Sequence, residues 1–118
     1  MSALKSMNSK IYVPERGDVV WIVLDPRVGH EQSGKRPALV LSPKLFSKRT
    51  GLAVICPITS KIKGLPFEIA IKTENINGAI LPIHLRSVDI YARKIKFIEK
   101  ASMKILNQTS KIVELMIN

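Results

Sequence analysis

Short apolar runs separated by turn residues fill most of the sequence and predict a protein built mainly from β-strands. Residues 19–24 form a continuous apolar run rich in β-branched side chains, which is typical of a strand buried on both faces. Residues 67–72 alternate like a half-exposed strand. The other apolar runs predict strands over residues 38–41, 52–58, 79–81 and 86–90.

The C-terminal segment has the period of an amphipathic helix. Apolar side chains recur seven residues after Ile105 and Leu106, and Ser102 is a suitable N-cap just before them. A shorter helical turn is expected over residues 43–49, capped by the Ser-Pro pair that ends the second strand. Residues 75–78 are expected to form a turn.

Together, these elements predict a small, strongly curved β-barrel or sandwich of five or six strands with one terminal helix. A length of 118 residues is that of one domain, which we assign to residues 12–118. Residues 1–11 have the polar composition of a mobile N-terminal arm. We expect the terminal helix to cover a sheet edge or to pair with a second copy.

Composition narrows the class of protein. Apolar residues make up 46% of the chain, which excludes disorder as its main state. No stretch approaches the roughly 20 apolar residues of a membrane-spanning helix, and the first eleven residues lack the apolar block of a secretory signal. The lone Cys56 can form neither an internal disulfide nor a Cys-based metal site. These features predict a cytoplasmic protein with no membrane partner.

The charge is strongly basic and unevenly distributed. Lys and Arg number 19 against 9 Asp and Glu, a net charge of +10. The segment from Arg27 to Lys63 holds eight bases and a single acid, Glu31, which gives it a local charge of +7. Such a concentration favours a polyanionic partner. Because aromatic residues make up only 5% of the chain, a platform that stacks many bases is not expected.

The loop between the first two predicted strands carries the most informative chemistry. Cleavage of RNA without a metal needs a base for the ribose 2′-hydroxyl, a cation for the phosphate and a proton donor for the leaving 5′-oxygen. Glu31 is a candidate base, Arg36 a candidate phosphate clamp, and His30 a candidate acid or base. The same Glu and Arg are also compatible with an ordinary exposed salt bridge.

Several short motifs, in one order, resemble those of the MazF/PemK toxins, the ribonuclease halves of bacterial toxin–antitoxin pairs. The resemblance extends over about residues 12–117. The matching segments are Arg16-Gly17-Asp18-Val19-Val20-Trp21, Asp25-Pro26, Gly29-His30-Glu31-Gln32, residues 36–42, Pro57-Ile58-Thr59-Ser60, residues 63–68 and Arg86-Ser87-Val88-Asp89.

This resemblance implies an SH3-like small β-barrel of the MazF/PemK/CcdB type with a C-terminal helix, acting as a homodimer. It implies a type II toxin that cleaves single-stranded RNA, including mRNA, at specific sequences without metal or cofactor and so inhibits translation and growth. The products would be a 2′,3′-cyclic phosphate and a 5′-hydroxyl. A cognate acidic antitoxin of the MazE/PemI type would occupy the basic groove.

The resemblance also assigns roles to individual residues. The implied catalytic residues are Glu31, Arg36 and Thr59. The implied RNA-binding residues are His30, Gln32, Lys35, Ser60, Lys61, Lys63, His84 and Arg86. No metal ligand is implied.

One departure from the family pattern keeps alternatives open. Many members carry Asp-Gln where this chain has Ile83 and His84, and some use an Arg where it has Leu81. His84 is therefore either a replacement base contact or an ordinary surface side chain. A gyrase-poisoning toxin of the related CcdB type and a catalytically weak RNA-binding relative remain the alternative functions.

Other conspicuous residues have structural explanations. The Arg-Gly-Asp tripeptide at residues 16–18 is expected to form a tight turn before the first strand, and Cys56 to be a buried, inert thiol. Trp21 is a core or interface residue, or else a stacking surface for a base. Asp89 is expected to order a strand end.

Overall fold

The computed structural model describes residues 11–23, 35–62 and 64–118. The helical elements in these ranges are α2 (Lys44–Thr50), the single 3-10 turn η2 (Pro82–His84) and α3 (Met103–Ile117). The strands are β1 (Asp18–Val23), β2 (Lys35–Val40), β3 (Leu52–Thr59), β4 (Ile69–Lys72), β5 (Asn77–Ile80), β6 (Arg86–Asp89) and β7 (Ile95–Lys100).

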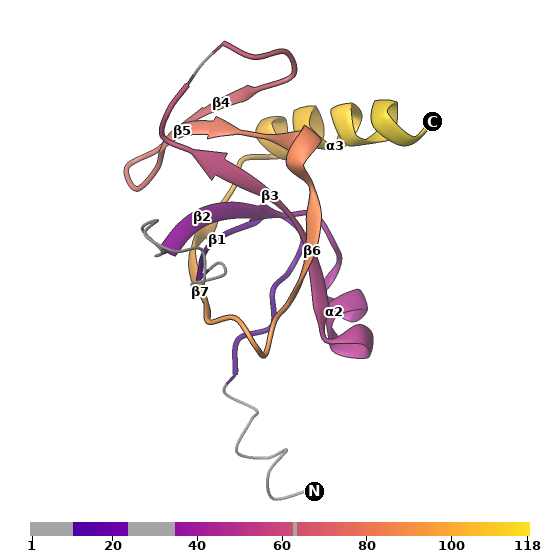
Figure 1. Ribbon diagram of the computed structural model, residues 1–118. Coiled ribbons are helices and arrows are strands. Elements are labelled where there is room, and N and C mark those ends of the chain that lie inside the picture. Colours follow the sequence, from indigo (N-terminus) through magenta and orange to yellow (C-terminus); the bar gives the residue numbers. More distant parts are fainter. Residues whose placement is uncertain (1–10, 24–34, 63) are drawn as a thin grey trace, which may run out of the picture.

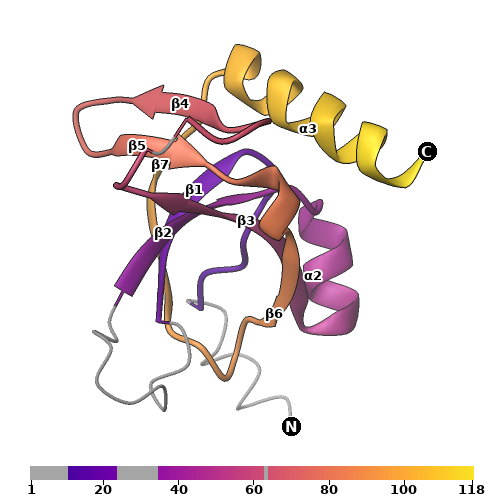
Figure 2. The same cartoon turned by 45° about the horizontal axis from the view of Figure 1, so that its top comes forward.

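The strands form one curled antiparallel sheet in the order β4-β5-β3-β2-β1-β7, with β6 also paired to β3 (Figure 1). Strand β3 is central to the curled sheet, because it pairs with three other strands. Its first four residues pair with β6 and its last two with β5, while β2 pairs with its middle from the other side. The result is the predicted SH3-like small barrel, with α3 lying beside β4 at one end of the sheet (Figure 2).

Two hydrophobic clusters occupy the two faces of the central strands. Val19 of β1 and Leu39 of β2 pack in the first cluster with Leu106 of α3. Their neighbours Val20 and Val40 point the opposite way, into a second cluster enclosed by the curled sheet. Because both faces are buried, the sequence of β1 reads as one apolar run, and the prediction of a strand buried on both faces is confirmed.

Two predicted boundaries around β4 and β5 are wrong. The alternating pattern predicts a strand from Phe67, but the φ of this residue is 67°, in the left-handed region, so β4 begins only at Ile69. The turn expected over residues 75–78 is centred earlier, where the Thr73 hydroxyl accepts hydrogen bonds from the amides of Asn75 and Ile76 at 3.1 and 3.0 Å. Gly78 belongs to β5.

Strand β7 is absent from the sequence-based prediction. Its residues, Ile-Lys-Phe-Ile-Glu-Lys, lack strict alternation, and most of them are exposed or half-buried. Within the described part of the sheet, β7 pairs only with β1, and the register shifts between Val19 and Val20. A charged edge strand with a bulge gives little apolar signal, because only one of its edges and part of one face meet the protein.

The helix predictions are confirmed with one correction. The Ser102 hydroxyl accepts a hydrogen bond from the Ile105 amide at 3.2 Å and caps α3 as expected. In α2 the N-cap position is Pro43, which makes no side-chain cap. Ser42 does not cap α2, because its hydroxyl accepts a hydrogen bond from the Val54 amide of β3 at 2.9 Å.

The Arg-Gly-Asp tripeptide forms the predicted turn at the start of β1. Gly17 has a φ of 93°, a conformation that favours glycine. Asp18 is 2% exposed and accepts hydrogen bonds from the Tyr12 hydroxyl and from the Glu15 amide. Arg16 donates to the Leu41 carbonyl at 2.8 Å. The motif therefore serves the fold and presents no free recognition loop.

Candidate active site

Arg36 and Thr59 come from opposite ends of two neighbouring antiparallel strands and meet at the same end of the sheet. The observed β2–β3 ladder ends with Ala38 opposite Pro57. Continuing this register by two residues on each strand places Arg36 opposite Thr59. Because side chains alternate along a strand, both lie on the face of the sheet that encloses the barrel interior. A guanidinium and a hydroxyl therefore occupy one corner of the molecule.

A pocket of about 330 Å³ opens at the same end of β2, toward the opposite face of the sheet, the face that carries Val19 and Leu39. Arg36 and Lys35 of β2 contribute to its wall together with Ser60, the residue that follows β3. Half-buried Trp21 of β1, which pairs with Pro37, contributes an aromatic surface. The remaining lining residues are Pro37, Ile76 and Asn77. Two cations and an aromatic surface in one pocket suit an anionic, partly apolar ligand such as a nucleotide.

The Thr59 hydroxyl, which does not line this pocket, is oriented by a backbone hydrogen bond. It accepts a hydrogen bond from the Lys61 amide at 3.1 Å, which uses an oxygen lone pair and not the hydroxyl proton. On the opposite strand, Gly78 allows close backbone approach, because a Cβ there would lie 2.2 Å from the Thr59 carbonyl oxygen. The half-buried Thr59 is therefore able to donate its proton to a phosphate oxygen.

The structure does not bring every predicted RNA contact to this pocket. His84, at the end of η2, and Arg86, at the start of β6, lie along the other edge of β3, and neither lines the pocket. Arg86 pairs with Ile55, which is four residues and about 13 Å along β3 from Thr59. Their assignment to the same RNA site stays a prediction.

The remaining predicted site residues divide into two groups. Lys61 is exposed and follows the pocket residue Ser60 directly. The others lie outside the described residues: His30, Glu31, Gln32 and Lys63.

Sequence reasoning misses two contributors to the pocket and leaves one open. Ile76 and Asn77 line it, although the Asn-Gly pair at 77–78 predicts simply a turn. The unusual signal is Gly78, whose place in a strand marks a close backbone approach. Trp21, interpreted as a core, interface or stacking residue, lies in the pocket wall.

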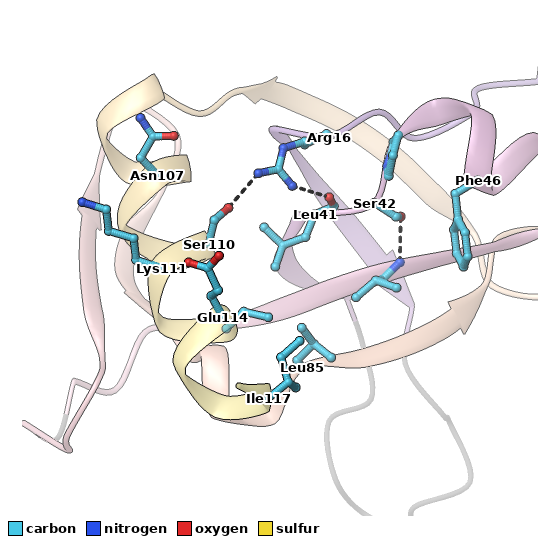
Figure 3. A pocket seen from close by; sticks show the side chains of 13 residues that line it. Arg16, Leu41, Ser42, Phe46, Leu85, Asn107, Ser110, Lys111, Glu114 and Ile117 are labelled. Atoms are coloured by element: carbon cyan, nitrogen blue, oxygen red, sulfur yellow. Dashed lines mark hydrogen bonds between the residues drawn. The ribbon is translucent and has the colours of Figure 1, made fainter.

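A groove of about 610 Å³ lies on another face, between α3 and the segment that joins β2 to α2 (Figure 3). Arg16 reaches across it and donates from its guanidinium to the Ser110 hydroxyl at 2.8 Å. Lys111 and Glu114 of α3 lie along the groove. Ile117, near the end of α3, contributes an apolar side chain that is 80% exposed.

The described residues contain neither a cluster suited to a metal ion nor a helix suited to spanning a membrane. In residues 11–23, 35–62 and 64–118, no three His, Cys, Asp or Glu side chains gather closely enough to hold a metal ion. None of the described helices is long and apolar enough to cross a membrane.

Sequence comparisons identify toxins of one class. The family described as "PemK-like, MazF-like toxin of type II toxin-antitoxin system" matches residues 15–117. The endoribonuclease toxin MazF of Escherichia coli strain K12 is 40% identical over 82 residues, which cover 70% of this chain and 74% of the relative. The endoribonuclease PemK of Escherichia coli is 33% identical over 99 residues, 80% of this chain and 74% of the relative.

Solved structures of toxins of this class have a similar fold. MazF in the MazE–MazF crystal structure (Form II) from Deinococcus radiodurans superposes with a TM-score of 0.83 at 38% identity, covering 90% of this chain and 96% of that one. The MazF crystal structure (Form I) from the same organism gives a TM-score of 0.80 at 38% identity, covering 90% and 97%. The chain belongs to the PemK-like, MazF-like family of type II toxins.

Proposed function

We propose that this protein is the endoribonuclease toxin of a type II toxin–antitoxin pair and cleaves single-stranded RNA, including mRNA, without a metal ion. Cleavage at specific sequences would inhibit translation and growth in the cytoplasm. The observation that carries the proposal is the β2–β3 register, which when continued puts Arg36 opposite Thr59 at the end of the sheet where Lys35 and Arg36 line a pocket. The relatives named endoribonucleases support the same activity.

The proposed reaction is an attack within the RNA chain. Glu31 takes the proton of the ribose 2′-hydroxyl, and the 2′-oxygen attacks the adjacent phosphorus. The bond from phosphorus to the 5′-oxygen breaks, and that oxygen takes a proton from protonated His30. The products are a 2′,3′-cyclic phosphate and a 5′-hydroxyl. Glu31 and His30 belong to the segment that precedes β2, the strand that places Lys35 and Arg36 in the pocket wall.

Arg36 and Thr59 stabilise the charge that develops on phosphorus. A guanidinium presents two parallel N–H donors to two phosphate oxygens, so Arg36 clamps the phosphate more specifically than a lysine would. The Thr59 hydroxyl adds a third donor from the neighbouring strand. Donors held on two hydrogen-bonded strands need little reorganisation during the reaction, and this is the main source of transition-state stabilisation.

Assembly with a second copy and with an antitoxin is part of the proposal. The groove of Figure 3 and the exposed end of α3 supply an apolar surface for a homodimer, because Leu115 and Ile117 are 66% and 80% exposed. The similarity to MazF in MazE–MazF crystal structures supports a cognate antitoxin. An acidic antitoxin segment would compete with RNA for Lys35, Arg36 and Lys61.

The decisive experiment is cleavage of a long single-stranded RNA by the purified protein in EDTA. We expect cleavage, with 5′-ends that polynucleotide kinase phosphorylates without phosphatase treatment, as 5′-hydroxyls require. Absence of cleavage in EDTA with recovery on adding a divalent metal would contradict the metal-free mechanism. Absence of cleavage in both conditions, together with trapping of gyrase on DNA, would instead favour a gyrase poison. RNA binding with no cleavage would favour the catalytically weak relative.

A further inference from the structure

A pocket of about 650 Å³ lies apart from the Arg36 pocket, between the chain entering β1, helix α2 and strand β7. We call it the α2 pocket. Three of the six aromatic residues of the chain line it: Tyr12, Tyr91 and Phe97. Tyr91 and Phe97 are 63% and 43% exposed, so solvent reaches both. Although the chain has few aromatic residues, this pocket contains two solvent-exposed aromatic rings.

One wall of the α2 pocket is basic. Lys44 and Lys48 stand four residues apart on α2, on the same face of the helix, and both line the pocket. Within the described residues, neither side chain is engaged in a salt bridge. Two exposed ammonium groups one helical turn apart form a site for a phosphate.

One lysine offsets part of the negative charge of the two acidic groups on the opposite wall. Asp18 accepts hydrogen bonds from the Tyr12 hydroxyl and the Glu15 amide. The Lys100 ammonium lies 2.6 Å from the Asp18 carboxylate and 3.1 Å from that of Glu15. The hydrogen bond to Asp18 is the main cause that raises the pKa of Lys100, so this lysine stays charged. Lys100 balances one of the two carboxylates, so the two lysines on α2 leave the α2 pocket with a net positive charge.

The exposed Tyr91 ring is held in place by its neighbours. The Asp89 carboxylate accepts hydrogen bonds from the Tyr91 and Ala92 amides at 2.8 and 2.9 Å. These bonds, with that of Ala92 first, lower the pKa of Asp89 and keep it ionised. A Cβ on Gly51 would lie 3.4 Å from the Tyr91 ring, so the ring packs over that glycine. Its position is thus set before any ligand arrives.

The α2 pocket is within reach of a strand bound at the catalytic corner. Phe97 pairs with Val20 across β7 and β1, and Ile22 pairs with Arg36 across β1 and β2, so Phe97 and Arg36 lie on the same face. Two residues along the strands and two strand spacings separate their backbones by about 12 Å. Val20 and Ile22 on this face are buried, so a strand joining the two sites follows the outer surface and is longer than this straight line.

We propose that the α2 pocket binds a nucleotide of the single-stranded RNA that lies outside the scissile step. The base stacks on Tyr91 and Phe97, and the phosphate lies between Lys44 and Lys48. Aromatic stacking next to a basic wall is the usual way in which proteins bind single strands independently of sequence. The inference rests on the proposed RNA cleavage and extends its binding site beyond the catalytic corner.

The test measures binding of a labelled, mixed-sequence 2′-O-methyl RNA of about 12 nucleotides, a length within known single-strand site sizes. This probe cannot be cleaved, because it lacks the nucleophile. We expect Tyr91→Leu to raise the Kd about fivefold or more through weaker stacking, and Tyr91→Phe to leave it unchanged. In the double variant Lys44→Gln/Lys48→Gln, the slope of log K against log salt should fall by about 0.7 for each phosphate that the protein no longer neutralises.

The matched control is Lys72→Gln/Lys104→Gln, which removes two exposed lysines from β4 and α3, outside the α2 pocket. Its salt slope should equal that of the wild type. Wild-type Kd and slope in both the Tyr91→Leu and the lysine variants, with RNA cleavage intact, would overturn the pocket assignment alone. Weaker binding of poly-L-glutamate with unchanged RNA binding would also overturn it, in favour of an acidic polypeptide. A wild-type protein that neither binds nor cleaves RNA would overturn the proposed function itself.

Discussion

Single residues at the catalytic corner carry constraints of two different kinds. Arg36 and Thr59 are the proposed catalytic residues, whereas Gly78 supplies space, because its missing side chain lets β5 approach the carbonyl of Thr59. Cys56 is a third kind of residue, a thiol that lies in the core between the sheet and α3 with no exposed surface. Each makes a separate prediction.

Replacing Arg36 by alanine should lower the rate of RNA cleavage by roughly 10²–10³-fold, the usual cost of losing one charge-stabilising donor. Lysine at this position should recover only part of the rate, because it lacks the planar pair of donors. The measurement is initial cleavage rate on one RNA substrate. Arg49→Ala, which removes an exposed arginine from α2, serves as the control and should cleave like the wild type.

Replacing Gly78 by alanine should lower the free energy of unfolding by about 1–3 kcal/mol, because the added methyl forces the β3–β5 pair apart. The same movement displaces Thr59, so cleavage should fall as well. Urea unfolding and a cleavage assay measure the two effects. A variant with unchanged stability and cleavage would show that the strands accommodate the methyl group, although a Cβ on Gly78 would lie 2.2 Å from the Thr59 carbonyl oxygen.

The Cys56 thiol should not react with a thiol reagent in the native protein at about pH 8. Burial raises its pKa to about 12, so the reactive thiolate is absent at that pH, and the side chain is also inaccessible. Addition of denaturant should release one reactive thiol per chain. Rapid labelling of the folded protein would contradict the burial.

At the scale of elements, the C-terminal helix α3 and the edge strand β7 stabilise the barrel. α3 begins at the Ser102 cap and packs Leu106 into the first core cluster. β7 closes the other side through its pairing with β1 and through the Lys100–Asp18 ion pair. Both elements cover surfaces that the apolar central strands alone would leave open to water.

Replacing Ser102 by alanine should reduce the free energy of unfolding by about 1 kcal/mol, since the amide of Ile105 loses its cap. Thermal or chemical unfolding detects this loss. Ser87→Ala, an exposed position in β6, should change stability by less than about 0.5 kcal/mol. Equal losses in the two variants would mean that the cap contributes nothing specific.

At the scale of the whole molecule, the surfaces divide by chemistry. Lys35, Arg36 and Trp21 line one pocket, while the exposed end of α3 is apolar and borders the groove of Figure 3, which has both apolar and polar side chains. One copy thus offers an anion-binding corner and a separate surface for association.

The double variant Leu115→Asp/Ile117→Asp should be monomeric where the wild type is dimeric, because two carboxylates at an apolar contact must lose their hydration. Sedimentation or light scattering at matched protein concentration gives the mass. Met103→Asp, at the opposite end of α3 and outside the groove, should leave the mass unchanged. A dimeric double variant would place the interface elsewhere.

Local sequence pattern was enough to predict the central strands, the terminal helix with its cap, and the basic character of the catalytic corner. An apolar side chain avoids water, and a serine caps an open helix end, whatever lies further along the chain. The pattern did not reveal β7, whose charged residues are stabilised mainly by pairing with β1. Nor did it show that Gly78 lies in a strand rather than in a turn.

Only the tertiary structure determines which side chains lie close together. Arg36 and Thr59 are far apart in the chain, and their proximity depends on the register of β2 against β3, which a slip of one residue would reverse. The pairing of β6 with β3 keeps Arg86 away from the Arg36 pocket, and the pairings of β1 with β2 and of β5 with β3 bring Trp21 and Asn77 to it. Register is a property of long-range pairing and steric fit, and no local sequence pattern contains it.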